Sequence, residues 1–236
     1  MRLTDLSTPQ VLVDRARLLA NLDRMQALAS SHGLKLRPHA KTHKSPAIAA
    51  WQIERGAIGI CCAKLGEAEV FAAAGVADIR LPYPVNPFEA PRVLALLDRT
   101  RLSLIVDHAD VARGWSAAMR RAGRTLDVLV KVDVGFHRCG IDPLNPGAAE
   151  FVERVAALPG LRFRGLLSHA GHGYAASSEA ALEQIAREEA AILNDLAAAV
   201  RARGVAVDDI SVGATPTARF SARQAGLTEM RDDRPY

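Results

Sequence analysis

Long apolar runs are missing from this 236-residue chain, and its net charge is small. No stretch of about 18 apolar residues occurs, which excludes a membrane-spanning helix and a membrane as partner. The polar residues 1–10 lack the apolar core of a secretion signal, so we expect a cytoplasmic protein. An evenly spread net charge of +4 argues against nucleic acid as a partner, and 49% hydrophobic residues exclude a disordered chain.

Cysteine is scarce as well. The chain has three cysteines, Cys61, Cys62 and Cys139, and an odd number with two neighbours does not suit a disulfide framework. No Cys-x-x-Cys pair and no clustered Cys/His spacing typical of zinc sites occurs. Cys61 and Cys62 are adjacent in an expected strand, so their side chains point to opposite faces and are poor joint ligands. We expect these thiols to pack in the core and this chain to hold no tight metal site.

Lysine is the third scarcity, because only five of the 30 basic residues are lysines. Three of the five, Lys35, Lys41 and Lys44, fall within ten residues. Unlike arginine, lysine can lose its proton and act as a nucleophilic amine. The cluster therefore indicates either solvated surface residues or a chemically active amine.

What the chain does contain is a regular alternation of short apolar runs and amphipathic, alanine-rich stretches. Eight apolar runs are expected to be strands, at residues 34–36, 58–62, 79–81, 102–106, 126–132, 163–167, 210–212 and 227–230. A strand-like run at residues 11–13 precedes them. Helices are expected at residues 15–31, 47–55, 66–74, 90–97, 109–121, 148–158 and 179–203.

This alternation predicts parallel strands joined by crossover helices, which is the α/β class. Eight units fit a closed (β/α)8 barrel of the TIM type, and a doubly wound open sheet is the alternative. No Gly-x-Gly-x-x-Gly follows the first strand, which weighs against the open sheet. We expect one barrel and no second domain within these residues.

Polar, titratable residues gather where the chemistry of such a barrel lies, in the loops after the strands. Four of these loops, at residues 37–44, 133–140, 168–174 and 213–217, hold five of the seven histidines. Histidine in a loop is often merely solvated, but convergence on one rim favours a site.

Two of these loops suggest the parts of a cofactor site. The segment 213–217, Gly-Ala-Thr-Pro-Thr, is either a phosphate-binding turn or an ordinary helix entry. Lys41 is flanked by His39 and His43, and burial beside other cations would lower its pKa and suit Schiff-base chemistry.

The other two loops add a cation and a hydroxyl. Arg138 could meet an oxyanion at the mouth of the barrel, and Tyr174 could contact a cofactor phosphate. A nucleophilic lysine and a phosphate turn on one rim indicate pyridoxal phosphate, or a Schiff-base aldolase that acts on a phosphorylated sugar.

The motifs around these residues resemble the D-threonine aldolase and D-serine dehydratase family, which are fold-type III pyridoxal-phosphate enzymes with the alanine racemase N-terminal barrel. The stretch Arg37-Pro-His-Ala-Lys-Thr-His-Lys44 carries the resemblance most specifically. The other matching segments are 8–9, 11–14, 59–69, 78–82, 133–138, 169–174 and 213–217. Together they extend over nearly the whole chain.

The resemblance implies roles for individual residues. Lys41 matches the Schiff-base lysine, and Arg138 matches the arginine that approaches the phenolic oxygen of the cofactor. Tyr174, Gly213 and Thr215 match contacts to the cofactor phosphate.

Histidines complete the implied site. His39 is expected to contact the cofactor, while His169 and His172 match histidines at the cofactor face and are expected to be catalytic. Lys44 is expected to support the site without forming the Schiff base. No residue is assigned to the ring nitrogen.

The implied activity is that of a pyridoxal 5'-phosphate-dependent lyase that acts on small β-hydroxy-D-amino acids. The reaction is either retro-aldol cleavage, as in D-threonine aldolase, or deamination, as in D-serine dehydratase. A homodimer is expected for the full-length protein.

The chain departs from the family in length. Family members continue into a β-rich domain that includes the leading strand and binds a divalent metal, zinc in the dehydratases and manganese or magnesium in the aldolases. We expect residues 1–14 to be the leading strand, 15–230 the barrel, and 231–236 the start of a C-terminal domain that is absent or truncated here. No residue of this chain matches the metal ligands.

Three alternatives stay open. One is a single-barrel protein that binds pyridoxal phosphate for homeostasis without lyase activity, and another is an amino-acid racemase. The third is a metal-free sugar-phosphate aldolase, for which Asp133 is the only carboxylate expected on the rim of Lys41.

Overall fold

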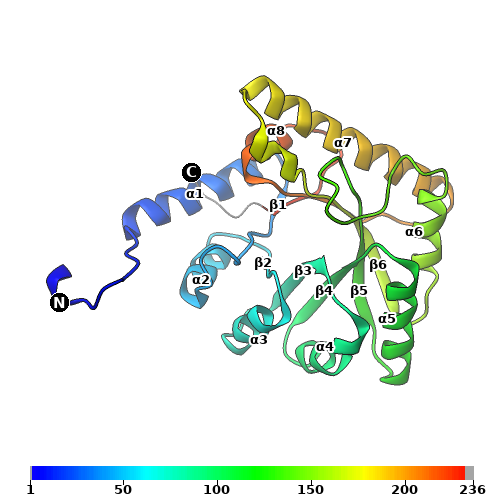
Figure 1. Ribbon diagram of the computed structural model, residues 1–236, viewed down its shortest axis with the longest axis horizontal. Coiled ribbons are helices and arrows are strands. Elements are labelled where there is room, and N and C mark those ends of the chain that lie inside the picture. Colours follow the sequence, from blue (N-terminus) through cyan, green and yellow to red (C-terminus); the bar gives the residue numbers. More distant parts are fainter. Residues whose placement is uncertain (1, 232–236) are drawn as a thin grey trace.

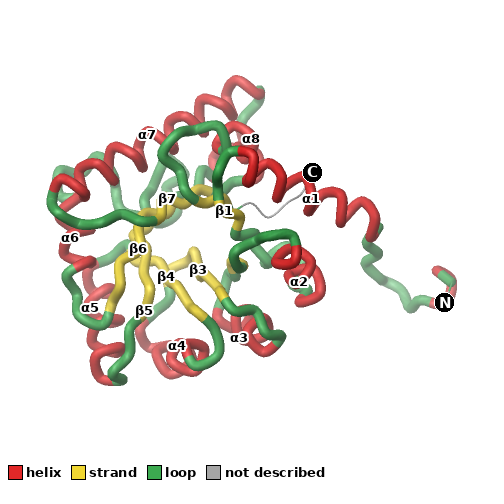
Figure 2. Tube along the Cα trace, turned by 180° about the vertical axis from the view of Figure 1, so that it is seen from behind, coloured by secondary structure: helices red, strands yellow, loops and turns green. Residues whose placement is uncertain are grey.

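Eight parallel strands form one sheet in the computed structural model, which describes residues 2–231. The strands are β1 (Lys35–Leu36), β2 (Ile60–Cys61), β3 (Asp78–Pro84), β4 (Arg101–Val106), β5 (Leu126–Lys131), β6 (Leu161–Leu167), β7 (Asp209–Val212) and β8 (Glu229–Met230). Their order in the sheet is β1-β8-β7-β6-β5-β4-β3-β2, so β2 to β8 follow one another in space as they do in sequence. Figure 2 shows the sheet curling round, with the helices outside it.

The two edge strands, β1 and β2, are joined by backbone hydrogen bonds from their flanking segments. Ile58 N donates to Leu36 O at 2.9 Å, Cys61 N to Pro38 O at 2.8 Å, and Ala40 N to Cys61 O at 2.7 Å. These bonds close the sheet on itself. The predicted (β/α)8 barrel is therefore confirmed, and the open doubly wound sheet is excluded.

Helices cover the outside of the ring (Figure 1). They are α1 (Arg15–Ser31), α2 (Pro46–Glu54), α3 (Leu65–Ala73), α4 (Ala90–Leu97), α5 (Ala109–Arg121), α6 (Ala148–Ala156), α7 (Glu179–Ala202) and α8 (Ala218–Ser221), with 3-10 turns η1 (Leu3–Asp5), η2 (Pro87–Glu89), η3 (Gly171–Ala175) and η4 (Thr215–Thr217). The sequence explains several starts, because Asp14, Ser45 and Ser178 each cap a helix with a side-chain oxygen. Within the described residues, no helix is both long and apolar enough to cross a membrane.

Side chains alternate between the two faces of the sheet. Outward-facing residues such as Leu104 pack against the helices around the fully buried Trp115 of α5. Among the inward-facing residues, Ile105, Leu129 and Leu167 form a small apolar cluster of their own inside the barrel. The main core therefore lies between sheet and helices.

The rest of the barrel interior is ionic. The side chains of Arg37, Arg80 and Glu229 are almost fully buried there. Arg37 Nε donates to Glu229 at 2.9 Å, Arg80 Nη1 donates to the other oxygen of the same carboxylate, and Arg80 Nη2 lies 3.3 Å from Asp209. Buried charges are tolerated only when they are paired in this way.

Most predicted elements are confirmed, with differences at their ends. Helices α1, α4 and α5 have the predicted bounds, whereas β1, β2 and β8 are only two residues long. Strand β6 begins at Leu161 rather than at residue 163, because Leu161 pairs with Leu126 of β5. Where a strand begins and ends thus depends on its hydrogen bonds to the neighbouring strand as well as on its own apolar residues.

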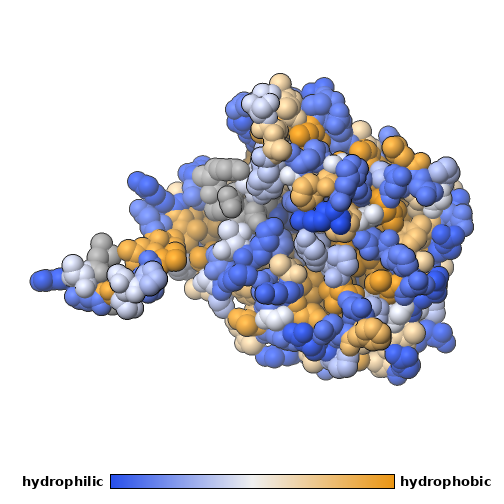
Figure 3. All heavy atoms as spheres, in the orientation of Figure 1, coloured by the Kyte–Doolittle hydropathy of each residue, from blue (hydrophilic) through white to orange (hydrophobic). Residues whose placement is uncertain are grey.

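Residues 11–13 do not form the predicted strand in this structure. They belong to no helix or strand, and the side chain of Val11 is 88% exposed. A strand needs a partner for its backbone groups, and none of the described residues provides one. Figure 3 shows this segment as part of an arm before α1 with apolar surface exposed. The pairing of residues 11–13 with a further domain stays a prediction. The predicted start of that domain, residues 231–236, lies outside the described residues except for Arg231.

Candidate active site

One pocket lies at the C-terminal ends of the strands. It is lined by the seven residues predicted to contact the cofactor: His39, Lys41, Arg138, His169, Tyr174, Gly213 and Thr215. Ala214 of the predicted phosphate turn also lines it, as do four residues that the sequence analysis did not place in the site: Pro82, Tyr83, Lys131 and Arg231. His172 is not among the lining residues. The structure thus brings the predicted contacts together, while their chemical roles stay predictions.

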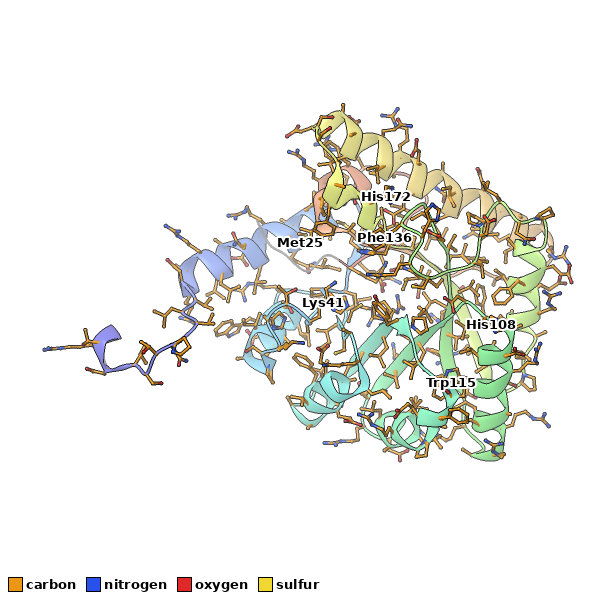
Figure 4. All side chains as sticks on the ribbon, viewed as in Figure 1. Met25, Lys41, His108, Trp115, Phe136 and His172 are labelled. Carbon is orange, nitrogen blue, oxygen red and sulfur yellow. The ribbon has the colours of Figure 1, made fainter. Side chains whose placement is uncertain are left out.

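Lys41 lies in the turn that follows β1. The Nδ1 atom of the buried His39 accepts a hydrogen bond from Lys41 N at 3.2 Å, which fixes the backbone of the turn at the mouth of the pocket. The Lys41 side chain is exposed there, so the burial expected from the sequence is not observed. In Figure 4, Lys41 lies near α2, below Phe136 and His172.

Lys44, the neighbouring lysine, is held away from the pocket. Its backbone has a positive φ of 49°, and its Nζ forms an ion pair with Glu67 of α3. Glu67 also accepts a hydrogen bond from Ala63 N at 2.8 Å. Burial raises the pKa of Glu67, but these bonds and the charge of Lys44 outweigh it and lower the pKa overall. This pairing supports the expectation that Lys44 has a structural rather than a covalent role.

Lys131 is the lysine that the structure buries. It is the last residue of β5, its side chain points into the barrel, and it is only 2% exposed. Burial lowers its pKa to about 7, and the neighbouring cations Arg231 and Arg138 act in the same direction. Its Nζ has no hydrogen-bond partner among the described residues. A buried amine that is partly neutral at physiological pH therefore lines the same pocket as Lys41.

Arg231 connects the pocket with the ionic interior. It follows β8, and its Nε donates to Ser211 Oγ at 2.8 Å while Nη2 donates to the carbonyl oxygen of Ser168. Ser211 in turn donates to Glu229 at 2.6 Å. Burial lowers the pKa of Arg231, but a guanidinium keeps its charge in proteins. The pocket is therefore continuous with a buried chain of hydrogen bonds.

His169 follows β6 and is neutral. Burial, with a smaller contribution from the cations Lys131 and Arg231, lowers its pKa to about 3. Its Nδ1 lies against the carbonyl oxygen of Gly213, so Nδ1 carries the proton and donates it, which leaves Nε2 as an acceptor. An imidazole in this state is a weak base, which argues for a packing role at the cofactor face over proton transfer.

His172 and Tyr174 lie on the 3-10 turn η3, which follows β6. His172 packs beside Gly135, where an added Cβ would lie 3.5 Å from His172 Cε1. Its Nδ1 is buried without a hydrogen-bond partner among the described residues. Tyr174 is 55% exposed and reaches the mouth of the pocket. Of this pair, the structure therefore places only Tyr174 at the pocket wall.

The turn at residues 213–217 lies against η3, since a Cβ added at Gly173 would lie 3.2 Å from Thr217 Cγ2. Gly213 has to be glycine, because an added Cβ would lie 2.9 Å from Arg231 Cβ. Thr217 Oγ1 donates to the carbonyl oxygen of Ala214 at 3.0 Å and stabilises the turn from within. The two threonines thus differ: Thr217 holds the turn, and Thr215 lines the pocket.

The cysteines pack in the core as predicted. Cys61 and Cys62 are both fully buried, Cys62 among the apolar residues between sheet and helices and Cys61 on the opposite, inward face. Burial raises the pKa of Cys61 to about 11, so this thiol stays protonated. Within residues 2–231, no group of three or more His, Cys, Asp or Glu side chains could hold a metal ion.

Several known proteins are similar to this chain in sequence and in fold. D-threonine aldolase from Arthrobacter sp. is 38% identical over 233 residues, which cover 97% of this chain and 60% of that protein. D-threo-3-hydroxyaspartate dehydratase from Delftia sp. (strain HT23) is 37% identical over 230 residues, with the same coverage. The crystal structure of D-threonine aldolase from Filomicrobium marinum, 33% identical, superimposes with a TM-score of 0.93 over 98% of this chain and 62% of that one.

The comparisons identify the barrel domain of this chain, whereas the relatives that share it differ in activity. The chain spans about 60% of the length of the two curated relatives above. The family model of the alanine racemase N-terminal domain matches residues 13–231, which include every strand and every pocket residue. The chain belongs to the alanine racemase N-terminal domain family.

Proposed function

We propose that this chain is the cofactor-binding barrel of a pyridoxal-phosphate-dependent lyase that acts on β-hydroxy-D-amino acids. The observation that carries the proposal is the single pocket that joins Lys41 to two arginines and the turn at 213–217. The relatives named D-threonine aldolase and D-threo-3-hydroxyaspartate dehydratase support the substrate class.

The donor set of the pocket suits pyridoxal phosphate. Lys41 offers an amine to an aldehyde, and Arg138 and Arg231 offer cations to its anionic groups. Lys131 adds a buried nitrogen without a partner among the described residues. The space between these side chains is narrow, about 30 Å³, so a ring-sized ligand has to displace the exposed side chains at the mouth.

Within this proposal, the residues of this chain bind the cofactor and orient it toward the substrate. The cofactor, when bound, supplies an electron sink for the carbanion formed beside the substrate amino group. Lys41 would hold the cofactor covalently, and in the dehydratase route its amine would take the α proton once the substrate amine has replaced it on the cofactor. His172 is the candidate base for the β-hydroxyl proton in the aldolase route. The neutral His169 packs at the cofactor face without taking a proton.

The divalent metal expected from the resemblance belongs to the same proposal. The described residues offer no group of three metal ligands, so we propose that zinc, manganese or magnesium would need ligands other than these residues. A homodimer and a cytoplasmic location are proposed for the full-length protein, and light scattering and cell fractionation test them.

One alternative loses support from the geometry. A sugar-phosphate aldolase would use Asp133 as the carboxylate near Lys41. The Asp133 carboxylate instead accepts hydrogen bonds from Gly135 N, His137 N and the His137 ring, and it does not line the pocket. The homeostasis and racemase alternatives remain outcomes of the experiments below.

Trapping the covalent bond tests the cofactor. We expect pyridoxal 5'-phosphate to give a visible absorbance band, and borohydride reduction followed by peptide mapping to find the label on Lys41. Lys41→Ala abolishes the band, and Lys44→Ala, the matched control, keeps it. A label on Lys44 or Lys131, or no label at all, contradicts the proposal.

Product analysis tests the reaction. A protein extended to the length of the relatives is given D-threonine and D-serine, and acetaldehyde, pyruvate and the enantiomers of the amino acids are measured. Acetaldehyde supports the aldolase route and pyruvate the dehydratase route. Racemisation alone refutes both lyase routes, and cofactor binding without any product favours the homeostasis protein.

A further inference from the structure

Phe136 is a large apolar residue that is exposed on a loop and yet touches two walls of the pocket. Its side chain is 38% exposed, and it does not itself line the pocket. Its ring centroid lies 5.2 Å from Arg138 Cζ. On the other side it meets His169 edge to face, with centroids 5.6 Å apart and planes at 84°. Phe136 therefore stands behind two residues that do line the pocket.

A second ring reaches the same guanidinium. Tyr83, near the end of β3, lies with its centroid 4.7 Å from Arg138 Cζ. Both distances fall within the range in which a cation is attracted to an aromatic face. Arg138 is exposed and forms no ion pair or hydrogen bond among the described residues, so these two rings are its observed contacts.

The loop is folded so that Phe136 keeps its place. The Asp133 carboxylate accepts hydrogen bonds from Gly135 N and His137 N, each at 3.0 Å, which wraps the loop round Phe136 at its tip. Gly171 of η3 makes room for the ring, because an added Cβ there would lie 2.6 Å from two Phe136 ring atoms. The ring thus rests on the backbone of a neighbouring turn.

We propose that Phe136 is a positioning residue that, together with Tyr83, fixes the guanidinium of Arg138 at the pocket for contact with an anionic group of the cofactor. A long arginine side chain without other partners loses rotamer freedom when it binds a ligand. Two aromatic faces restrict that freedom beforehand, so less is lost on binding. The inference rests on the proposed function only for the identity of the ligand.

The geometry is tested without cofactor. In protein labelled with ¹⁵N-arginine, the Nε–H resonance of Arg138, assigned by Arg138→Lys, is shifted by the ring currents of Phe136 and Tyr83. Phe136→Leu removes part of the shift, and Phe136→Tyr, the conservative variant, keeps it. An Arg138 resonance that does not move in Phe136→Leu overturns the proposal.

The consequence is tested with pyridoxal 5'-phosphate in a double-mutant cycle. We expect Phe136→Leu to raise the dissociation constant about 2- to 30-fold, which is the range of a cation–π contact. The same substitution in an Arg138→Met background has a much smaller effect, because the cation is already gone. Tyr83→Leu and Tyr83→Phe repeat the comparison from the other ring.

Two results overturn the proposal. Equal losses for Phe136→Leu with and without Arg138 show that Phe136 acts through His169 or the loop. A loss in Phe136→Tyr as large as in Phe136→Leu shows that the ring face is not what matters. If the wild-type protein binds no pyridoxal phosphate, the proposed function fails, whereas the arginine resonance still decides the positioning role.

Discussion

Two lysines line the pocket, and they differ in what surrounds the amine. The Lys41 side chain is exposed at the mouth, while Lys131 is buried beneath it beside two arginines. Under the proposed function, the Lys41 amine at the mouth is the one that an incoming aldehyde meets first, whereas the buried Lys131 amine, which has no hydrogen-bond partner among the described residues, mainly affects stability. Position, rather than basicity, separates their roles.

Burial of Lys131 makes the stability of the protein depend on pH. The folded pKa is about 7 and the ordinary value is 10.5, so between these pH values the unfolded chain binds a proton that the folded chain does not. Stability therefore rises with pH across this window, by at most about 1.4 kcal/mol per pH unit. We expect Lys131→Met to flatten this dependence and to stabilise the protein without cofactor at neutral pH.

Urea unfolding at several pH values between 7 and 10.5 measures this effect. Lys64→Met, which changes an exposed lysine, is the matched control and keeps the wild-type slope. Parallel pH profiles for wild type and Lys131→Met would contradict the burial of a neutral amine.

The motifs predicted seven of the pocket residues, and what they missed has a physical cause. Lys131 ends an apolar run, and its inward direction follows from alternation with Asp127 and Leu129, which the motif search did not use. Arg231 was assigned to a further domain, because only the register of β8 shows that it turns back into the barrel. The state of His169 was out of reach, since it depends on burial and on a carbonyl group 44 residues away in sequence.

At the scale of the elements, β6 and β7 approach each other more closely than any side chain allows. Gly165 of β6 pairs with Asp209 of β7 and has a φ of +151°. An added Cβ would lie 1.9 Å from the carbonyl oxygen of Asp209. Gly204, after α7, also has a positive φ, but a Cβ there would meet nothing within 4 Å.

These two glycines make a matched pair for mutation. We expect Gly165→Ala to lower the free energy of unfolding by about 3 kcal/mol or more, because both strain and a clash oppose it. Gly204→Ala carries the strain alone and costs about 1–2 kcal/mol. Thermal or urea unfolding compares them, and equal losses would contradict the close approach of the strands.

Helices were easier to predict than strands, for reasons visible in particular elements. Asp14 and Ser178 mark the starts of α1 and α7 within the local sequence. The two-residue strands β1, β2 and β8 depend on partners far along the chain, so their ends cannot be seen locally. Residues 11–13 have the apolar pattern of a strand but no partner strand among the described residues. An apolar pattern without a partner does not form the hydrogen bonds of a sheet.

At the scale of the whole molecule, the ionic interior sets the response to acid. Burial raises the pKa of Glu229, but Arg80, Arg37 and the Ser211 hydroxyl outweigh it and lower the pKa from 4.5 to about 2. A carboxyl with a lowered folded pKa contributes its stability above pH 4.5 and loses it as the pH falls from 4.5 towards 2. We expect acid unfolding to set in within this window.

Glu229→Gln tests the contribution directly. It leaves Arg37 and Arg80 buried without their shared carboxylate, so we expect a loss of about 3–5 kcal/mol at neutral pH. Glu69→Gln removes an exposed ion pair with Arg92 and costs at most about 1 kcal/mol. Similar small losses for both variants, measured by denaturant unfolding at neutral pH, would show that the interior pairs do not hold the barrel.

Closure of the barrel also has a consequence for how the protein is made. Lys35 pairs with Glu229, so the first strand waits for the last, and the residues up to β8 have to leave the ribosome before the two can meet. Lys41 follows the first of these strands and Arg231 follows the last. A nascent chain that stops short of β8 has the lysine but only part of the pocket. The pocket is therefore completed only when β8 joins the sheet, so binding of a ligand in the pocket would report a closed barrel.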